Sequence, residues 1–261
     1  MNTQRLITSD GVVLAYYRWG NPSAVPVVLH HGFAASAVSN WVLPGIVDAL
    51  TGAGHSVIAM DARGHGQSGK PHDPARYGEA RMAQDLREVL AHLHVGRFDL
   101  FGYSMGAVAS LILASQASGV RRLIVAGVGE GVLECGGVDT RVIHRDSLVA
   151  ALLTPDISTI ADPAAGSFRL FAEANGNDLA ALAAQAQRMH ATPIPLERIT
   201  APVRVLAGMD DMLARQPERL AAAIPGAQLL MVPGDHLGAI RQPALIDATC
   251  RFFDLSQEIH A

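Results

Sequence analysis

Short apolar segments alternate with segments of helical length through most of this chain, and this alternation constrains the fold more than any other feature. Continuous apolar strands separated by helices are typical of a parallel sheet that is covered on both faces. The sequence therefore predicts an α/β fold. The predicted strands span residues 12–17, 25–30, 56–60, 98–103, 122–128, 203–207 and 228–232. The predicted helices span residues 42–53, 79–94, 105–117, 216–224 and 244–253.

The alternation stops after residue 128, and no clear strand pattern appears from residue 129 to residue 195. This segment is rich in alanine and is interrupted by prolines. Its pattern predicts helices near residues 140–153, 164–174 and 178–190. We therefore expect one α/β core made of residues 1–128 and 196–261, with a helical cap inserted at residues 129–195. Such an insert is a candidate lid over a binding site.

The composition of the 261-residue chain argues against several classes of protein. Apolar residues make up 49% and charged residues 17%, which argues against disorder as the main state. The formal net charge is -4 and no basic patch appears, so we expect no nucleic-acid partner. The cysteines, Cys135 and Cys250, are too few for a disulfide framework or a four-thiolate zinc site.

Membrane association is also not expected from the sequence. No apolar stretch approaches the roughly 20 residues that span a bilayer. The first residues lack the apolar core and the cleavage site of a secretory signal. A cytoplasmic protein is therefore the expectation, and the sequence leaves its oligomeric state open.

The strongest chemical motif is Gly102-Tyr103-Ser104-Met105-Gly106, which satisfies G-x-S-x-G. A predicted strand precedes this motif and a predicted helix follows it, as its mechanism requires. The turn between the two elements is tight and strained, and it raises the serine hydroxyl above the sheet at a helix N-terminus. We therefore predict that Ser104 is a nucleophile.

A serine nucleophile needs a base, and eleven histidines compete for that role. Ligands bind at the carboxyl ends of the strands in an open parallel sheet. His236 closely follows the predicted strand 228–232 and is therefore the expected base. His31 and His65 also follow predicted strands, and they remain the alternatives.

The base in turn needs an acid that fixes its tautomer and stabilises the imidazolium. Asp210 and Asp211 follow the predicted strand 203–207, again at a carboxyl end. Asp211 is the favoured candidate, and Asp210 and Glu130 remain alternatives. The chain order Ser104, Asp211, His236 is the order expected for a hydrolase with this serine elbow.

The developing oxyanion needs preorganised N–H donors. Met105 follows the nucleophile and offers a backbone N–H at a helix N-terminus. The second donor should come from the loop after strand 25–30, where Phe33 N–H is our candidate. This machinery needs neither a cofactor nor a metal ion.

These motifs together resemble the α/β-hydrolase superfamily, in its small, lid-bearing serine-hydrolase branch. The matching pieces are His31-Gly32-Phe33, residues 61–68, Gly102-Tyr103-Ser104-Met105-Gly106, Gly208-Met209-Asp210-Asp211 and Gly234-Asp235-His236. The resemblance implies an eight-stranded, mostly parallel sheet whose second strand is antiparallel, with helices on both faces. It also implies a structural role for residues 61–68, and it supports Asp211 because the acid usually lies three residues after a strand-ending glycine.

The resulting expectation is an enzyme that transfers an acyl group from a small molecule to water. A small carboxylic ester, thioester or lactone is the favoured substrate, cleaved through an acyl-enzyme on Ser104. Cofactor-free perhydrolase (chloroperoxidase-like) activity and carbon–carbon bond hydrolysis use the same triad and stay open. A non-hydrolytic small-molecule receptor is a further alternative. The resemblance argues against epoxide opening, because that chemistry uses an aspartate at the elbow.

The helical insert offers side chains that either line a small, largely apolar acyl pocket or bury the insert helices against one another. These side chains are Leu148, Leu152, Leu153, Phe168, Phe171 and Met189.

Overall fold

A computed structural model describes residues 2–116 and 118–254. Residue 117, predicted to end a helix, lies outside the described residues, as do residues 1 and 255–261 of the expected core. The described chain forms one eight-stranded sheet, so the α/β fold is confirmed. Its strands are β1 (Gln4–Ile7), β2 (Val13–Trp19), β3 (Pro26–His30), β4 (Ser56–Met60), β5 (Phe98–Tyr103), β6 (Val120–Ala126), β7 (Val203–Gly208) and β8 (Gln228–Val232).

The strands lie in the order β1-β2-β4-β3-β5-β6-β7-β8. Strand β2 runs antiparallel to β1 and to β4, whereas the pairs from β4 to β8 are parallel. The antiparallel second strand is thus confirmed. Strands β3, β4 and β5 are buried at every position, which explains why their sequences are nearly continuous apolar runs.

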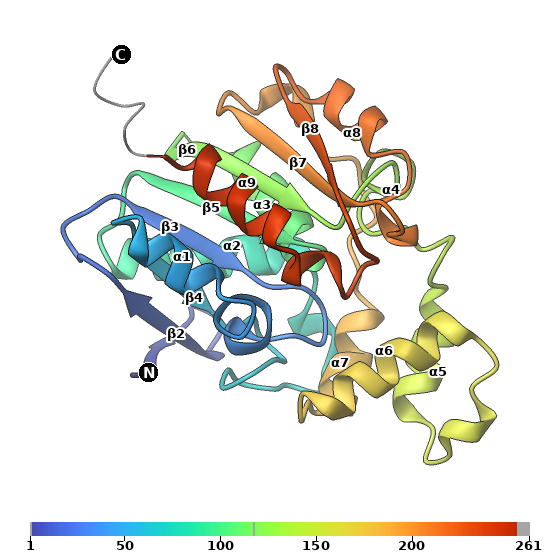
Figure 1. The fold of residues 1–261 in the computed structure, drawn as a ribbon. Coiled ribbons are helices and arrows are strands. Elements are labelled where there is room, and N and C mark those ends of the chain that lie inside the picture. The colour runs from blue at the N-terminus through green and yellow to red at the C-terminus, as the bar shows by residue number, and fades with distance from the viewer. Residues whose placement is uncertain (1, 117, 255–261) are drawn as a thin grey trace.

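Helices cover both faces of the sheet (Figure 1). Helices α1 (Ile46–Gly52) and α9 (Pro243–Phe252) pack on one face. Helices α2 (Glu79–His92), α3 (Met105–Ala114) and α8 (Pro217–Ala223) pack on the other. Every residue of α3 is buried, in keeping with a sequence that is apolar at all positions but Ser110. This burial fixes the N-terminus of α3 relative to the sheet, and Ser104 precedes that N-terminus.

Two parts of the core differ from the sequence prediction. Strand β1 was not expected, because its four residues alternate between half-buried and exposed at the edge of the sheet. Helix α1 begins at Ile46, later than expected, because Gly45 adopts a φ of 89° and interrupts the helical backbone. The residues before it, Val38–Val42, form a separate π-helical turn.

Residues 129–195, hereafter the helical segment, contain helices and no strand, and all of them are described. The helices are α4 (Gly131–Glu134), α5 (Arg145–Leu153), α6 (Pro163–Ala174) and α7 (Leu179–Ala186). Asp162 and Asp178 cap the N-termini of α6 and α7 by accepting backbone N–H bonds. In Figure 1, α5, α6 and α7 lie together beyond one edge of the core. Their apolar side chains share a cluster with Phe33 and Met105.

Helix α6 agrees with the sequence prediction to within one residue, whereas α5 and α7 are shorter than predicted and α4 was not predicted. Helix α5 starts at Arg145 because residues 140–144 form turns, in which Arg141 bonds the Asp139 carboxylate. Helix α7 ends at Ala186, and the His190 N–H turns away to bond the Glu79 side chain. In residues 2–116 and 118–254, no helix has both the length and the apolar character needed to cross a bilayer.

Candidate active site

Ser104 lies in the turn between β5 and α3, where the backbone is strained. Its φ of 52° and ψ of -116° are unusual for a residue with a side chain, and such a conformation costs about 1–3 kcal/mol. The Ser104 N–H donates to the Ala126 carbonyl at 2.7 Å, which ties the turn to β6. Gly106 is required because a Cβ there would lie 2.0 Å from the His30 carbonyl oxygen. The tight packing of this turn therefore holds the hydroxyl in place.

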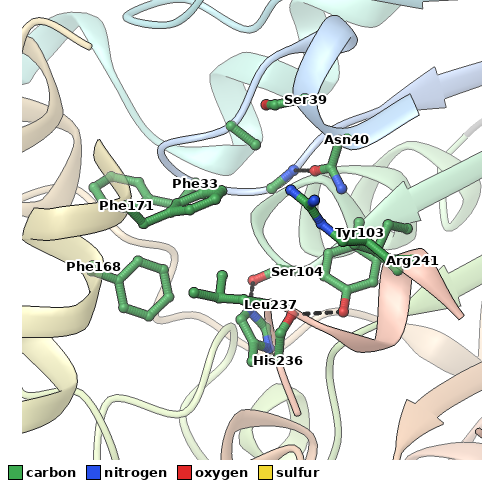
Figure 2. A pocket seen from close by; sticks show the side chains of 13 residues that line it. Phe33, Ser39, Asn40, Tyr103, Ser104, Phe168, Phe171, His236, Leu237 and Arg241 are labelled. Atoms are coloured by element: carbon green, nitrogen blue, oxygen red, sulfur yellow. Dashed lines mark hydrogen bonds between the residues drawn. The ribbon is translucent and has the colours of Figure 1, made fainter. Parts of the chain in front are cut away.

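His236 follows β8 and lies beside Ser104. Its Nε2 is 3.0 Å from Ser104 Oγ, and its Nδ1 is 2.9 Å and 3.0 Å from the two Asp211 carboxylate oxygens. The Tyr103 hydroxyl donates to the His236 carbonyl at 2.8 Å and fixes this loop (Figure 2). The side chains of Ser104, His236 and Asp211 thus form one hydrogen-bonded row at the carboxyl ends of β5, β8 and β7.

The Asp211 carboxylate is fully buried and is held by its own loop. Its Oδ1 accepts the Leu213 N–H at 2.9 Å and the Ala214 N–H at 3.2 Å. Asp210 is exposed, so the structure brings Asp211 rather than Asp210 to His236. The third acid considered, Glu130, pairs instead with Arg141 and Arg219.

The two alternative bases hold loops of the core instead of contacting Ser104. His31 Nδ1 lies 2.8 Å from the Gly32 carbonyl oxygen, and its Nε2 accepts the Ala62 N–H at 2.9 Å. His65 Nδ1 lies 2.9 Å from the Arg63 carbonyl oxygen. Burial lowers the pKa of His31, and it lowers the pKa of His65 to about 3.

Residues 61–68, for which the family resemblance implies a structural role, are organised around a buried carboxylate. Asp61 accepts the Tyr17 hydroxyl and the N–H groups of Ala37 and Gln67, each at 2.8 Å. Three donors on separate segments therefore converge on one side chain. This arrangement ties β2 and the loop after β3 to the loop after β4.

The backbone N–H groups of Phe33 and Met105 are the predicted donors to the oxyanion. Within the described residues, neither group donates to a protein acceptor. Met105 is the first residue of α3, where a backbone N–H has no partner inside the helix and the helix dipole is positive. The loop that carries Phe33 is fixed because the Gly32 N–H donates to Asn40 Oδ1 at 2.9 Å.

Two cavities meet at Ser104, and Phe33 and Phe168 line both of them. The first, here called the His236 cavity, spans about 390 Å³, a volume that includes space open to solvent. Its other lining residues include Asn40, Tyr103, Phe171, His236, Leu237 and Arg241. Figure 2 shows Phe168 and Phe171 on one side of Ser104, and Asn40, Tyr103 and Arg241 on the other. This cavity therefore has an aromatic wall and a wall that carries hydrogen-bond donors.

The second, here called the Glu79 cavity, spans about 420 Å³, a volume that includes space open to solvent. Its other lining residues include Glu79, Met105, Ile143, Leu148, Gln185 and Met189. Of the six side chains that the sequence offered from the insert, Leu148, Phe168 and Met189 line this cavity and Phe171 lines the His236 cavity. Leu152 is buried between the helices, and Leu153 is 55% exposed.

Apart from Ser104 and His236, the polar residues that line the two cavities were not assigned from the sequence, above all Glu79. An acidic residue in the first turn of a helix is common because it complements the helix dipole, so its position carried no signal. In the structure Glu79 is 2% exposed, and its Oε2 accepts the His190 N–H at 2.6 Å. No cationic side chain forms an ion pair with it among the described residues. Burial raises the pKa of Glu79 to about 7.

This buried carboxyl predicts a pH-dependent effect of the E79Q substitution. The native state holds the Glu79 proton up to about pH 7, whereas the unfolded chain releases it near pH 4.5, so wild-type stability falls as pH rises between these values. The fall amounts to about 3 kcal/mol, because one pKa unit corresponds to about 1.4 kcal/mol. The E79Q variant has no such proton and keeps an acceptor for the His190 N–H.

Urea denaturation of both proteins across this pH range checks the prediction. The difference between the free energies of unfolding of E79Q and of the wild type should shift by about 3 kcal/mol in favour of E79Q from below pH 4.5 to above pH 7. A difference that stays constant across the range would show that Glu79 titrates normally in the native state.

Comparison with known proteins agrees with this fold. A family profile described as alpha/beta hydrolase fold matches residues 25–139. Epoxide hydrolase A from Mycobacterium tuberculosis is 35% identical over 127 residues, which cover 47% of this chain but only 38% of that relative. The match therefore spans well under half of that curated relative's length.

Solved structures match nearly the whole chain. A hydrolase from Pseudomonas aeruginosa PA01 superposes with a TM-score of 0.74 at 28% identity, covering 96% of this chain and 98% of that one. The esterase RhEst1 from Rhodococcus sp. ECU1013 superposes with a TM-score of 0.71 at 25% identity, covering 98% and 99%. Taken with the family profile and the strand order, these matches show that the chain belongs to the α/β-hydrolase superfamily.

Proposed function

We propose that this protein is a serine hydrolase that cleaves a small carboxylic ester, or a related thioester or lactone, through an acyl-enzyme on Ser104. The observation that carries the proposal is the hydrogen-bonded row of Ser104, His236 and Asp211. The row lies beside two N–H groups that lack a protein acceptor among the described residues. A nucleophile, a base, an acid and an oxyanion hole are the components of acyl transfer.

In the first half of the reaction, Ser104 Oγ attacks the carbonyl carbon and passes its proton to His236 Nε2. Asp211 accepts the Nδ1–H of His236, which keeps Nε2 unprotonated before attack and stabilises the imidazolium afterwards. The N–H groups of Phe33 and Met105 donate to the oxyanion. The bond to the leaving group then breaks, and the leaving oxygen or sulfur takes the proton from Nε2.

In the second half, water attacks the acyl-enzyme. His236 Nε2 removes a proton from the water as its oxygen bonds to the acyl carbon. The second tetrahedral intermediate collapses, releases the carboxylic acid and returns the proton to Ser104 Oγ. The same residues therefore serve both halves, and the net reaction consumes one ester and one water.

Each of the two cavities binds a different part of the substrate. The leaving group must lie within reach of His236 Nε2, which donates its proton. Only the His236 cavity is lined by that residue, so it holds the leaving group. The Glu79 cavity is lined by Ser104 and Met105, and it holds the acyl group. The helical segment forms one wall of each cavity and acts as the lid over a core made of residues 1–128 and 196–261.

The serine at the turn between β5 and α3 also favours ester hydrolysis over the epoxide hydrolysis for which one relative is named. A relative at 35% identity is an epoxide hydrolase, and two of the full-length structural matches are a hydrolase and an esterase. Ser104, placed against His236, suits attack on a carbonyl carbon followed by hydrolysis of an acyl-serine. The esterase-like reaction is therefore the one we propose.

The test is a partitioning experiment with one acyl group on several leaving groups. Acetate esters of p-nitrophenol and phenol and a thiophenol thioester are hydrolysed in water that contains methanol. If all substrates form one acyl-enzyme, the ratio of acid to methyl ester is the same for each leaving group. A ratio that changes with the leaving group would contradict the acyl-enzyme, and the absence of turnover would favour the receptor alternative.

A further inference from the structure

The Glu79 cavity holds an unexpected pair of polar side chains beside the nucleophile. Its wall is otherwise apolar, formed by residues such as Ile143, Leu148 and Met189. Glu79, from the start of α2, and Gln185, from α7, both line it and are 2% and 0% exposed. Buried polar groups normally have strong partners, so two such groups in one apolar cavity need an explanation.

The protein gives these two side chains few hydrogen bonds. The Glu79 carboxyl accepts one strong bond, from the His190 N–H, and no side-chain donor bonds it among the described residues. Gln185 Oε1 is 3.4 Å from the Gly78 N–H, and its Nε2 is 3.8 Å from the sulfur of Met105. These distances are at the limit of a hydrogen bond, and a thioether is a weak acceptor. The side-chain oxygens of Glu79 and Gln185 therefore accept fewer hydrogen bonds from the protein than they are able to.

An acyl chain that is purely hydrocarbon would leave the remaining acceptor positions of these two side chains without a partner. Leaving a buried acceptor without a partner costs about 1–3 kcal/mol, and more when the group is charged. An acyl chain whose length brings a hydrogen-bond donor to Glu79 or Gln185 supplies the missing partner. A largely apolar pocket with a few convergent polar groups is the usual form of a specific small-molecule site.

We propose that Glu79 and Gln185 form a specificity subsite for an acyl group that carries a hydrogen-bond donor, a hydroxyl or an ammonium group, at the end of an otherwise apolar chain. The inference rests on the proposed function, since it assigns the acyl group to the Glu79 cavity. The His190 N–H holds the Oε2 atom of the carboxyl in place. Burial raises the pKa of Glu79 to about 7, against the opposing effects of the backbone N–H bonds and of the Arg145 charge, which forms no ion pair with it in the described part of the chain.

The test compares three p-nitrophenyl esters of equal chain length that end in methyl, hydroxyl and ammonium, namely heptanoate, 6-hydroxyhexanoate and 6-aminohexanoate. The comparison is repeated with shorter and longer spacers. At pH 8, the wild type should show a kcat/KM about 10- to 100-fold higher for a donor-ended ester than for its methyl-ended match, at the spacer that reaches Glu79. A methyl-ended ester that is equal or better at every spacer length would overturn the proposal.

The E79Q variant separates the charge of Glu79 from its hydrogen-bonding capacity. It keeps an oxygen for a hydroxyl but loses the charge that attracts an ammonium group. Its kcat/KM ratio of ammonium to hydroxyl ester should fall about tenfold or more. The E218Q variant makes the same charge change at an exposed position on α8 and should leave this ratio unchanged. If E79Q also leaves it unchanged, Glu79 has only a structural role.

Direct binding distinguishes failure of the subsite from failure of the proposed function. Calorimetry with the S104A variant measures the affinity of the same esters without turnover. Tighter binding of the donor-ended esters would support the subsite even if the wild type hydrolysed none of them. Equal binding of all three, beside normal turnover by the wild type, would leave the hydrolase intact and overturn the subsite.

Discussion

Replacing Ser104 with alanine should lower kcat for ester hydrolysis by about five to six orders of magnitude, because no other hydroxyl occupies the attacking position. The effect is this large because nucleophile and base act as a unit, so loss of either removes nearly the whole contribution of the triad. The Ser104 hydroxyl bonds His236 Nε2 at 3.0 Å, and the remaining site is unchanged by its removal. Steady-state kinetics with a p-nitrophenyl ester measure the loss.

Stability measurements distinguish the loss of the nucleophile from the loss of the fold. The S104A variant should unfold at nearly the wild-type temperature, because alanine has the same backbone preferences at a φ of 52°. The S104G variant should be equally inactive yet more stable than S104A by about 1 kcal/mol, because glycine relieves the strain of this turn. Activity retained by either variant would remove Ser104 from the role of nucleophile.

The second large effect is expected from D211N, which should lower kcat by about four orders of magnitude. The Asp211 oxygen that caps the following turn accepts the N–H groups of Leu213 and Ala214. An asparagine oxygen takes over these bonds, which turns the amide NH₂ toward His236 Nδ1. The imidazole then adopts the tautomer with its proton on Nε2, and that nitrogen no longer accepts the Ser104 proton.

The neighbouring D210N substitution is the matched control, because it makes the same chemical change one residue away. Asp210 is exposed and its backbone N–H, which survives the substitution, donates to the Gly234 carbonyl at 3.1 Å. Its kcat should therefore stay within a few-fold of the wild-type value. A larger loss in D210N than in D211N would assign the acid to Asp210.

The sheet was predictable because its central strands are buried from end to end. The boundaries of β4, β5 and β8 agree with the sequence prediction, since punctuating turns bracket short apolar runs there. The edge strand β1 has no such run and was missed. Helix ends in the helical segment were also misplaced, because tertiary contacts such as that between His190 and Glu79 compete with the last helical turn.

The candidate site was predictable where a motif fixes the backbone. The G-x-S-x-G turn places Ser104, and the strand order brings the loops carrying Asp211 and His236 to the same edge. The sequence left Asp210 and Asp211 as competing acids because the turn after β7, rather than residue type, decides which side chain points inward. Glu79 and Gln185 could not be assigned, because only packing of the helical segment on the core brings α2 and α7 to one cavity.

The most direct test of the central claim is covalent labelling with a fluorophosphonate, followed by mass spectrometry of the digested protein. The reagent bonds to a serine that a neighbouring base activates and whose oxyanion hole is formed. We expect one adduct, on Ser104, with labelling lost in H236A as well as in S104A. An adduct on another residue, or no adduct on the folded protein, would contradict a serine hydrolase acting through Ser104.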